Sequence, residues 1–261
     1  MEQGNSDNNI MKSTVTAIIQ ARMNSTRLPG KAMLELAGRP LLYHVFERIQ
    51  AAPGVDQVIL ATCNGGENEK IIRLAQSLAI PVFIGSEDNV LERFYLAAEK
   101  FGGDYIMRVT GDNPFTDPGF AAMTIETARA TGADLCYLSN LPLGTGAGII
   151  KKSALDAAYR HSDKPHHFEH VSPYIREHPE IFRTEIREIE LYNPFSNLRL
   201  TVDTAEDYEL ASIIYGNLYH NAPFSFADVI KFLEHNPGLL AINGHIQQRP
   251  MTHTSIKCGT P

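Results

Sequence analysis

The sequence predicts an α/β protein built on a mostly parallel sheet flanked by helices. Short apolar runs, the first of them Val15 to Ile19, alternate with stretches in which apolar residues recur at helical spacing. Strands that alternate with helices of this length form βαβ units, whose sheets are covered on both faces. The 261 residues, 43% of them hydrophobic, are enough for one large domain with a proper core.

The first hundred residues carry the clearest pattern. The expected strands are 15–19, 57–62, 81–84 and 104–109, and the expected helices are one opened by Pro40, then 67–79 and 89–101. Because ligands of such sheets bind at the carboxyl ends of the strands, the loops that follow these strands are the candidates for chemistry.

The pattern loosens after residue 139. Strands are expected at 182–189 and 198–202, with a helix from Ala205. We expect one domain over 14–245, with a smaller subregion inserted at about 140–195, a polar disordered leader over 1–13 and a flexible tail over 246–261.

Composition argues against several classes of protein. The formal net charge of -7 disfavours a nucleic-acid binder, which needs a broad basic face. No run approaches 18 apolar residues, so we expect no membrane span. Cys63, Cys136 and Cys258 are odd in number and form no CxxC motif, which indicates a reducing, cytoplasmic location.

A cationic loop follows the first strand, in the stretch ARMNSTRLPGKAM. A P-loop would need glycine and Ser or Thr where the chain has Ser25 and Ala32, and the loop has no GxGxxG motif. Arg22, Arg27 and Lys31 nevertheless supply forked and mobile cations that suit a polyphosphate. The alternative is a solvated loop that pairs with acids such as Glu35 and Glu47.

Two aspartates follow apolar strands far apart in the chain. Asp112 lies in RVTGDNPFTDP and Asp203 in LRLTVDTAEDYEL. Magnesium prefers one or two carboxylates together with phosphate oxygens, so the two side chains would make a site if they meet. Each also has a local alternative, since Asp112 suits an Asx turn, and Asp203 or Thr204 suits a helix cap. Arg108, just ahead of TGD, either pairs with Asp112 or faces phosphate.

These motifs resemble one known family. ARMNSTRLPGKAM followed by LAGRPLLYHV, then TGDNP, and finally VDTAEDYE are similar to the motifs of the cytidylyltransferases that activate sugar acids, the acylneuraminate and KDO enzymes, and particularly of their SpsF-like spore-coat relatives. The resemblance runs from about Thr16 to Gly216. It implies a Rossmann-like, GT-A-like nucleotidyltransferase fold and a homodimer.

The resemblance also implies site residues. The family's loop wraps the triphosphate of CTP, and its two motif aspartates bind the metal, here Mg2+. The implied catalytic residues are Arg22, Lys31, Asp112 and Asp203, with Asp112 and Asp203 as metal ligands. The implied nucleotide contacts are Ala21, Arg22, Ser25, Thr26, Arg27, Lys31, Arg93 and Asp112. For Arg93, in GSEDNVLERFYLAA, the alternative is an ordinary solvated arginine on a helix.

The segment HHFEHVSPYI offers a rival hypothesis. His166, Glu169 and His170 satisfy the HxxEH spelling of an inverted zinc peptidase. Pro165 and Pro173 leave only a short helix for it, and three residues match easily by chance. SpsF-like relatives have a similar REHVTPYI stretch, which implies that Glu169 and His170 line the acceptor pocket, together with Asn140; a plain core histidine is the remaining alternative.

One stretch departs from the family pattern. Where SpsF-like relatives carry acids in a pattern like GLDVE, Gly144 to Gly148 read GTGAG. A more acidic or bulkier acceptor is therefore expected, bound in the 140–195 subregion that also serves dimerisation. We expect transfer of CMP from CTP to a sugar acid or similar small anionic acceptor, with release of pyrophosphate. The alternatives are a nucleotide-binding protein without turnover, and transfer to a phosphonate or a sugar phosphate.

Overall fold

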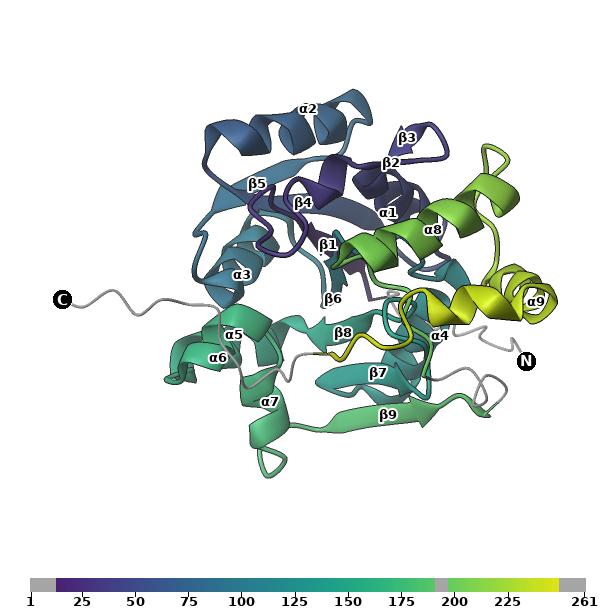
Figure 1. The fold of residues 1–261 in the computed structure, drawn as a ribbon. Coiled ribbons are helices and arrows are strands. Elements are labelled where there is room, and N and C mark those ends of the chain that lie inside the picture. Colours follow the sequence, from purple (N-terminus) through teal and green to yellow (C-terminus); the bar gives the residue numbers. More distant parts are fainter. Residues whose placement is uncertain (1–12, 191–196, 249–261) are drawn as a thin grey trace, which may run out of the picture.

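A central mixed sheet organises the computed structural model, which describes residues 13–190 and 197–248 (Figure 1). In the described residues it has seven strands in the order β5-β4-β1-β6-β8-β7-β9. Their bounds are β1 Val15–Gln20, β4 Gln57–Cys63, β5 Val82–Gly85, β6 Tyr105–Thr110, β7 Leu135–Ser139, β8 Gly148–Lys151 and β9 Thr184–Glu188. A separate two-residue pair joins β2 Glu35–Leu36 and β3 Arg39–Pro40.

The strand directions agree with the predicted, mostly parallel sheet. β5, β4, β1 and β6 are all parallel, and β7 pairs in parallel with β9. Only β8 runs against its neighbours, β6 and β7. The central parallel strands β1, β4 and β6 are largely apolar and buried because helices cover both of their faces, whereas β9, at the edge of the sheet, is polar and mostly exposed.

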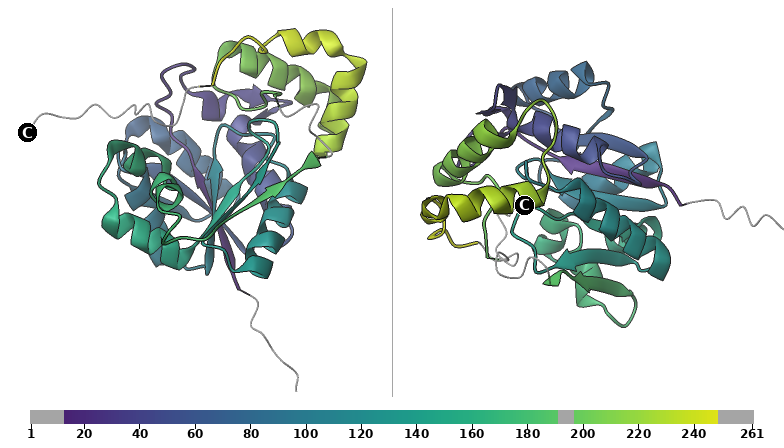
Figure 2. Two further views of the ribbon diagram at one scale, coloured as in Figure 1. Left: turned by 90° about the horizontal axis from the view of Figure 1, so that it is seen from below. Right: turned by 90° about the vertical axis from the view of Figure 1, so that its right-hand side faces the viewer.

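The helices lie on both faces of the sheet. Their bounds are α1 Leu41–Gln50, α2 Glu69–Ser77, α3 Val90–Phe101, α4 Pro118–Thr131, α5 Lys152–His161, α6 Pro165–His170, α7 Pro173–Glu177, α8 Ala205–Leu218 and α9 Phe226–His235, with short 3-10 turns at Lys31–Met33, Gly66–Asn68 and Pro237–Ala241. Alternation along β1 divides the core, since Ala17 and Ile19 pack with α1, α4 and α8, whereas Ile18 packs with α3 and α5. Figure 2 shows α8 and α9 on one side of the molecule and α5–α7 on the other.

The expected early strands and helices are confirmed to within a few residues, but one later expectation is wrong. The stretch 198–202 is not a strand: within the described residues it makes a single bridge, between Leu143 and Arg199. Its backbone instead crosses the carboxyl edge of the sheet, where Val202 N donates to Asp112 O (2.8 Å). This crossing passes so close to Gly144 that a β-carbon there would lie 2.6 Å from Thr201 N.

The remaining expectations concern the 140–195 stretch and the ends. Its described residues contribute β8 and β9 to the same sheet, and α5–α7 pack against one face. Residues 1–12 of the predicted leader, residues 249–261 of the predicted tail, and Cys258 lie outside the described residues. Cys63 and Cys136 are buried free thiols. Among the helices of the described part, none is long and apolar enough to cross a membrane.

Candidate active site

The loop after β1 is anchored at the carboxyl edge of the sheet. Met23 N donates to the side-chain oxygen of Asn68 (2.9 Å), and the Asn68 amide donates to Cys63 O at the end of β4 (3.1 Å). Asn68 is only 2% exposed. Gly30 N in turn donates to Met23 O (3.1 Å), which closes the loop. These bonds fix the start of the 3-10 turn that carries Lys31.

A second loop packs directly against the first. Gly111 N donates to Gln20 O (2.8 Å), and a β-carbon on Gly111 would lie 2.7 Å from the Ala21 β-carbon. Only glycine permits this approach of the two backbones. Asp112, the next residue, is thereby held beside the cationic loop.

Lys31 joins the two predicted aspartates. Its Nζ lies 2.6 Å from Asp112 Oδ2 and 2.7 Å from Asp203 Oδ1 (hydrogen bonds and ion pairs in both cases). Burial works to lower the pKa of Lys31, but the two carboxylates outweigh it, and the pKa is raised. The Asp112 carboxylate makes no Asx-turn bond among the described residues, so its side chain is committed to this contact.

Asp203 is held by further cations. Arg27 lies 3.0 Å from its Oδ2, and Arg199 lies 3.2 Å from the same oxygen. Burial works to raise the pKa of Asp203, but Lys31, Arg27 and Arg199 together lower it. Arg199 also donates to Asp207 (2.8 Å), whose side chain is fully buried. We call Arg27, Lys31, Asp112, Asp203, Arg199 and Asp207 the charge cluster.

Of the two residues suited to cap the helix after 198–202, Thr204 does so and Asp203 does not. Thr204 is the N-cap of α8, and it forms a capping box with Asp207. Asp207 Oδ2 also accepts from the amide of Asp203 (3.0 Å). The cap therefore orients Asp203 and leaves its carboxylate for the charge cluster.

Other residues predicted to contact the nucleotide lie outside this cluster. Arg22 is 3.8 Å from Glu87 in an exposed ion pair. Arg93 is buried and donates to the carbonyl oxygens of Ser86 and Glu87, the loop that carries this acid. Ala21 N donates to Ala61 O (3.3 Å), and Ser25 N to Met23 O (2.9 Å). Thr26 is exposed in the same loop.

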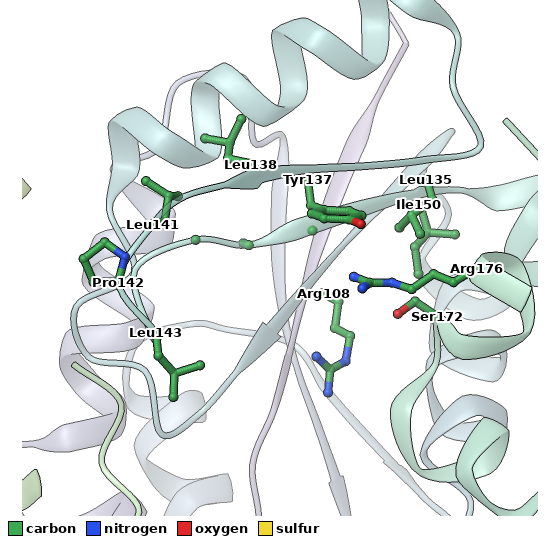
Figure 3. A pocket seen from close by; sticks show the side chains of 14 residues that line it. Arg108, Leu135, Tyr137, Leu138, Leu141, Pro142, Leu143, Ile150, Ser172 and Arg176 are labelled. Atoms are coloured by element: carbon green, nitrogen blue, oxygen red, sulfur yellow. The ribbon is translucent and has the colours of Figure 1, made fainter. Parts of the chain in front are cut away.

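The residues predicted to bind the acceptor flank a separate pocket. Asn140 follows β7 and donates to Glu188, and Glu169 and His170 end α6, just before Ser172. None of the three lines the pocket itself, whose wall includes Arg108, Tyr137, Ser172 and Arg176 (Figure 3).

The histidine segment does not assemble the HxxEH trio. Among the described residues, the three-ligand grouping that is close enough for a metal is His166, His167 and Glu177. Glu177 is also bound by Lys164. These ion pairs lower the pKa of Glu177 to about 2, with the Lys164 hydrogen bond as the largest cause. The grouping contains neither Glu169 nor His170.

Asp112 and Asp203 satisfy one geometric requirement for a divalent cation. Both carboxylates reach a common point, because each bonds the same Nζ atom. Two aspartates that converge in this way, with phosphate oxygens and water completing the shell, fit Mg2+.

An α/β sheet that gathers a lysine, arginines and two aspartates at its carboxyl edge suits a nucleotidyltransferase. The family described as "Cytidylyltransferase" matches residues 16–236, and the chain belongs to this family. It is 33% identical to the spore coat polysaccharide biosynthesis protein SpsF of Bacillus subtilis, over 84% of this chain and 94% of that protein.

Solved structures agree with this assignment. A cytidylyltransferase from Leptospira borgpetersenii superposes with a TM-score of 0.81 at 27% identity and covers 91% of this chain and 100% of its own. A CMP:2-keto-3-deoxy-manno-octonic acid synthetase complexed with CTP has a TM-score of 0.61 at 17% identity, over 79% of this chain and 100% of its own, and shows the shared fold.

Several residues that build the site were not predicted from the sequence. Asn68 anchors the cationic loop, whereas Arg199 and Asp207 orient Asp203. Arg199 could have been noticed in the sequence, because it is a charged residue inside the apolar run LRLTV. Nothing in the sequence marks Asn68, because its role depends on a contact with a distant loop.

Proposed function

We propose that this protein transfers CMP from CTP to a small anionic acceptor, a sugar acid or a related molecule, with Mg2+ and with release of pyrophosphate. The observation that carries the proposal is the contact of Lys31 with both Asp112 and Asp203. Family membership and the fold shared with a synthetase that binds CTP support it. Surface-glycan biosynthesis, a cytoplasmic location and a homodimer belong to the same proposal.

The cations of the loop supply the triphosphate site. Arg27 and Lys31 are already beside the carboxylates, and Arg22 is exposed on the same loop. Arginine binds phosphate oxygens in pairs and lysine binds them as a point charge. Held in this way, the α-phosphorus faces an acceptor hydroxyl in line with the bond to the departing pyrophosphate.

Asp112 and Asp203 would hold the metal. When bound, Mg2+ neutralises charge on the phosphates and on the pyrophosphate leaving group. The residues of the chain contribute positioning and preorganised charge, and no covalent enzyme intermediate is required.

The charge cluster suits an exchange of partners. In the structure, Lys31 and Arg27 neutralise the two aspartates. With magnesium and the triphosphate bound, Asp112 and Asp203 would hold the metal, and Lys31 and Arg27 would bind phosphate oxygens. Neither set is left as uncompensated charge, which would be costly in a partly buried site.

Asp112→Asn tests the proposal. Pyrophosphate release from CTP, measured across a panel of sugar acids, phosphonates and sugar phosphates, is expected to fall at least ~1,000-fold, whereas the fold is kept. Asp163→Asn, at an exposed aspartate, is the matched control. Full turnover by Asp112→Asn would contradict the metal assignment, and CTP binding by the wild type without turnover on any acceptor would favour a binding protein.

A further inference from the structure

The pocket beside the charge cluster has a volume of about 240 Å³. Its floor comes from β6, β7 and β8, and its sides come from the 141–148 loop and from α7. Figure 3 shows the Arg176 side chain reaching toward the Tyr137 ring with Ser172 beside it, and Arg108 below them with its guanidinium directed away from the ring. Three separate parts of the chain, β6, β7 and α7 with its N-cap, therefore line one space with polar groups.

The wall of this pocket supplies no acid to balance its positive charge. No aspartate or glutamate is among its lining residues. Arg108 Nε is buried and has no hydrogen-bond partner in the described parts of the chain. Arg176 lies at the exposed rim, with its guanidinium 4.3 Å from the centre of the Tyr137 ring. Burial is the largest influence on Arg108 and lowers its pKa, Arg176 lowers it further, and the charge of Asp112, outside the pocket wall, only partly offsets this.

One side of the pocket is apolar. Its wall includes the side chains of Leu135, Leu138, Leu141, Leu143 and Ile150, and the glycines of GTGAG present no side chain at all. A ligand rich in hydroxyl groups would leave many of them without a partner here, at a cost for each. An anionic ligand with an apolar body leaves none.

The pocket is joined to the charge cluster through the backbone. Arg108 and Asp112 are close in the chain, at the end of β6. Leu143, from the pocket wall, bridges to Arg199, and Leu200 N donates to Leu143 O (2.8 Å). A ligand in the pocket would lie beside the proposed site of the α-phosphorus.

We propose that this pocket is the acceptor subsite, where Arg108 and Arg176 bind an oxyanion of the acceptor and the leucine wall takes an apolar, hydroxyl-poor part of it. This assignment rests on the proposed function. It narrows the acceptor to molecules that carry a carboxylate or a phosphate and in which the carbon atoms next to that anion are deoxygenated or acylated. The two oxyanions share their recognition chemistry, since both accept paired bonds from guanidinium groups.

The first test is calorimetric titration of the full-length protein with n-butyl phosphate and with pentanoate, each with and without CTP and Mg2+. One of the two probes is expected to bind, and the tighter one identifies the oxyanion. Arg108→Gln should weaken that probe by about 10- to 100-fold and Arg176→Gln by about 10-fold. Arg160→Gln, at an exposed arginine of α5, is the matched control. If neither probe binds, or if Arg108→Gln binds like the wild type, the assignment is wrong.

The second test addresses the apolar wall. The probe that binds should do so at least ~10-fold more tightly than the same oxyanion without its butyl group, inorganic phosphate for butyl phosphate or formate for pentanoate, because each buried methylene contributes several-fold. A β-carbon on Gly148 would meet nothing nearer than 3.7 Å, so Gly148→Leu fills the pocket without a main-chain clash. This variant should abolish the preference for the butyl group, and an unchanged preference would overturn the assignment of the wall.

The affinity for CTP, measured on the same samples, separates this inference from the proposed function. Unchanged CTP affinity with lost probe binding supports the subsite. A wild type that binds the probe but not CTP would refute the proposed function and leave an anion pocket. Probe binding that survives every pocket variant, with CTP bound normally, would refute the subsite alone.

Discussion

The two parts of the sheet's carboxyl edge treat charge in opposite ways. In the charge cluster, Lys31, Arg27 and Arg199 each contact an aspartate at 3.2 Å or less. In the neighbouring pocket, Arg108 and Arg176 line a wall without acids. The first part is electrostatically complete and can bind a ligand only by exchanging partners. The second part gains its compensating charge from the ligand.

The largest expected effect comes from removing a cation of the charge cluster. Arg199→Met would leave Asp207, whose side chain is fully buried, with only neutral hydrogen-bond partners. Breaking a buried ion pair in this way is expected to lower the free energy of unfolding by about 3–5 kcal/mol, measured by urea denaturation.

A second substitution checks the cause of this loss. Asp207→Asn added to Arg199→Met should restore part of the stability, because it removes the uncompensated charge. A loss below ~1 kcal/mol for the single variant would show that the charge cluster is not electrostatically coupled as described.

Lys31→Met is expected to have the next largest effect. Removing one preorganised cation from the phosphate site should lower kcat/KM for pyrophosphate release by about 100- to 1,000-fold. Without nucleotide, Mg2+ should raise the Tm of Lys31→Met more than that of the wild type, because no ammonium group then competes for the two carboxylates. Lys70→Met, at an exposed surface pair, is the control. An equal or weaker response to Mg2+ would argue against a shared metal point.

The sequence predicted the parts of this site that depend on local patterns. The cationic loop, the two aspartates, and the parallel strands before the loop and before Asp112 follow from periodicity and from residue type within short stretches. It could not predict that Lys31 would contact both carboxylates, since this depends on how three distant loops pack. It also misjudged 198–202, because an apolar run of strand-like composition pairs here with loops at the edge and not with the sheet.

The pocket, too, could be predicted only in part from the sequence. The sequence shows that GTGAG lacks the acids of the SpsF-like pattern, and the pocket wall likewise contains no acid. The sequence left two roles open for Arg108, an ion pair with Asp112 or a contact with phosphate. Arg108 forms no ion pair with the described residues, although the charge of Asp112 acts on it, and this outcome depends on the position of α7 and on the register of β8 against β6.

Arg108→Met sharpens the comparison with Arg199→Met, because its effect on the free energy of unfolding is expected to have the opposite sign. Methionine keeps most of the apolar stem and removes a charge that has no acidic partner in the pocket. The free energy of unfolding is therefore expected to stay the same or rise by up to about 1 kcal/mol, again by urea denaturation. A loss of ~2 kcal/mol or more would mean that Arg108 is compensated in the folded protein, and the contrast between the two parts would fail.

The smallest effect is expected at the rim of the cationic loop. Arg22 and Glu87 form an exposed pair, with side chains 44% and 42% exposed at 3.8 Å, and such pairs contribute little to stability. Glu87→Gln should therefore change the free energy of unfolding by less than ~0.5 kcal/mol. If Arg22 binds the triphosphate, the same change should tighten CTP binding by about 2- to 3-fold at low salt, because it frees the guanidinium and removes a nearby negative charge. Calorimetry should show the gain shrinking in about 0.5 M salt, where exposed charges are screened. Glu69→Gln, in a comparable exposed pair with Arg73, should leave CTP affinity unchanged, and an equal gain there would mean that overall charge, and not Arg22, is responsible.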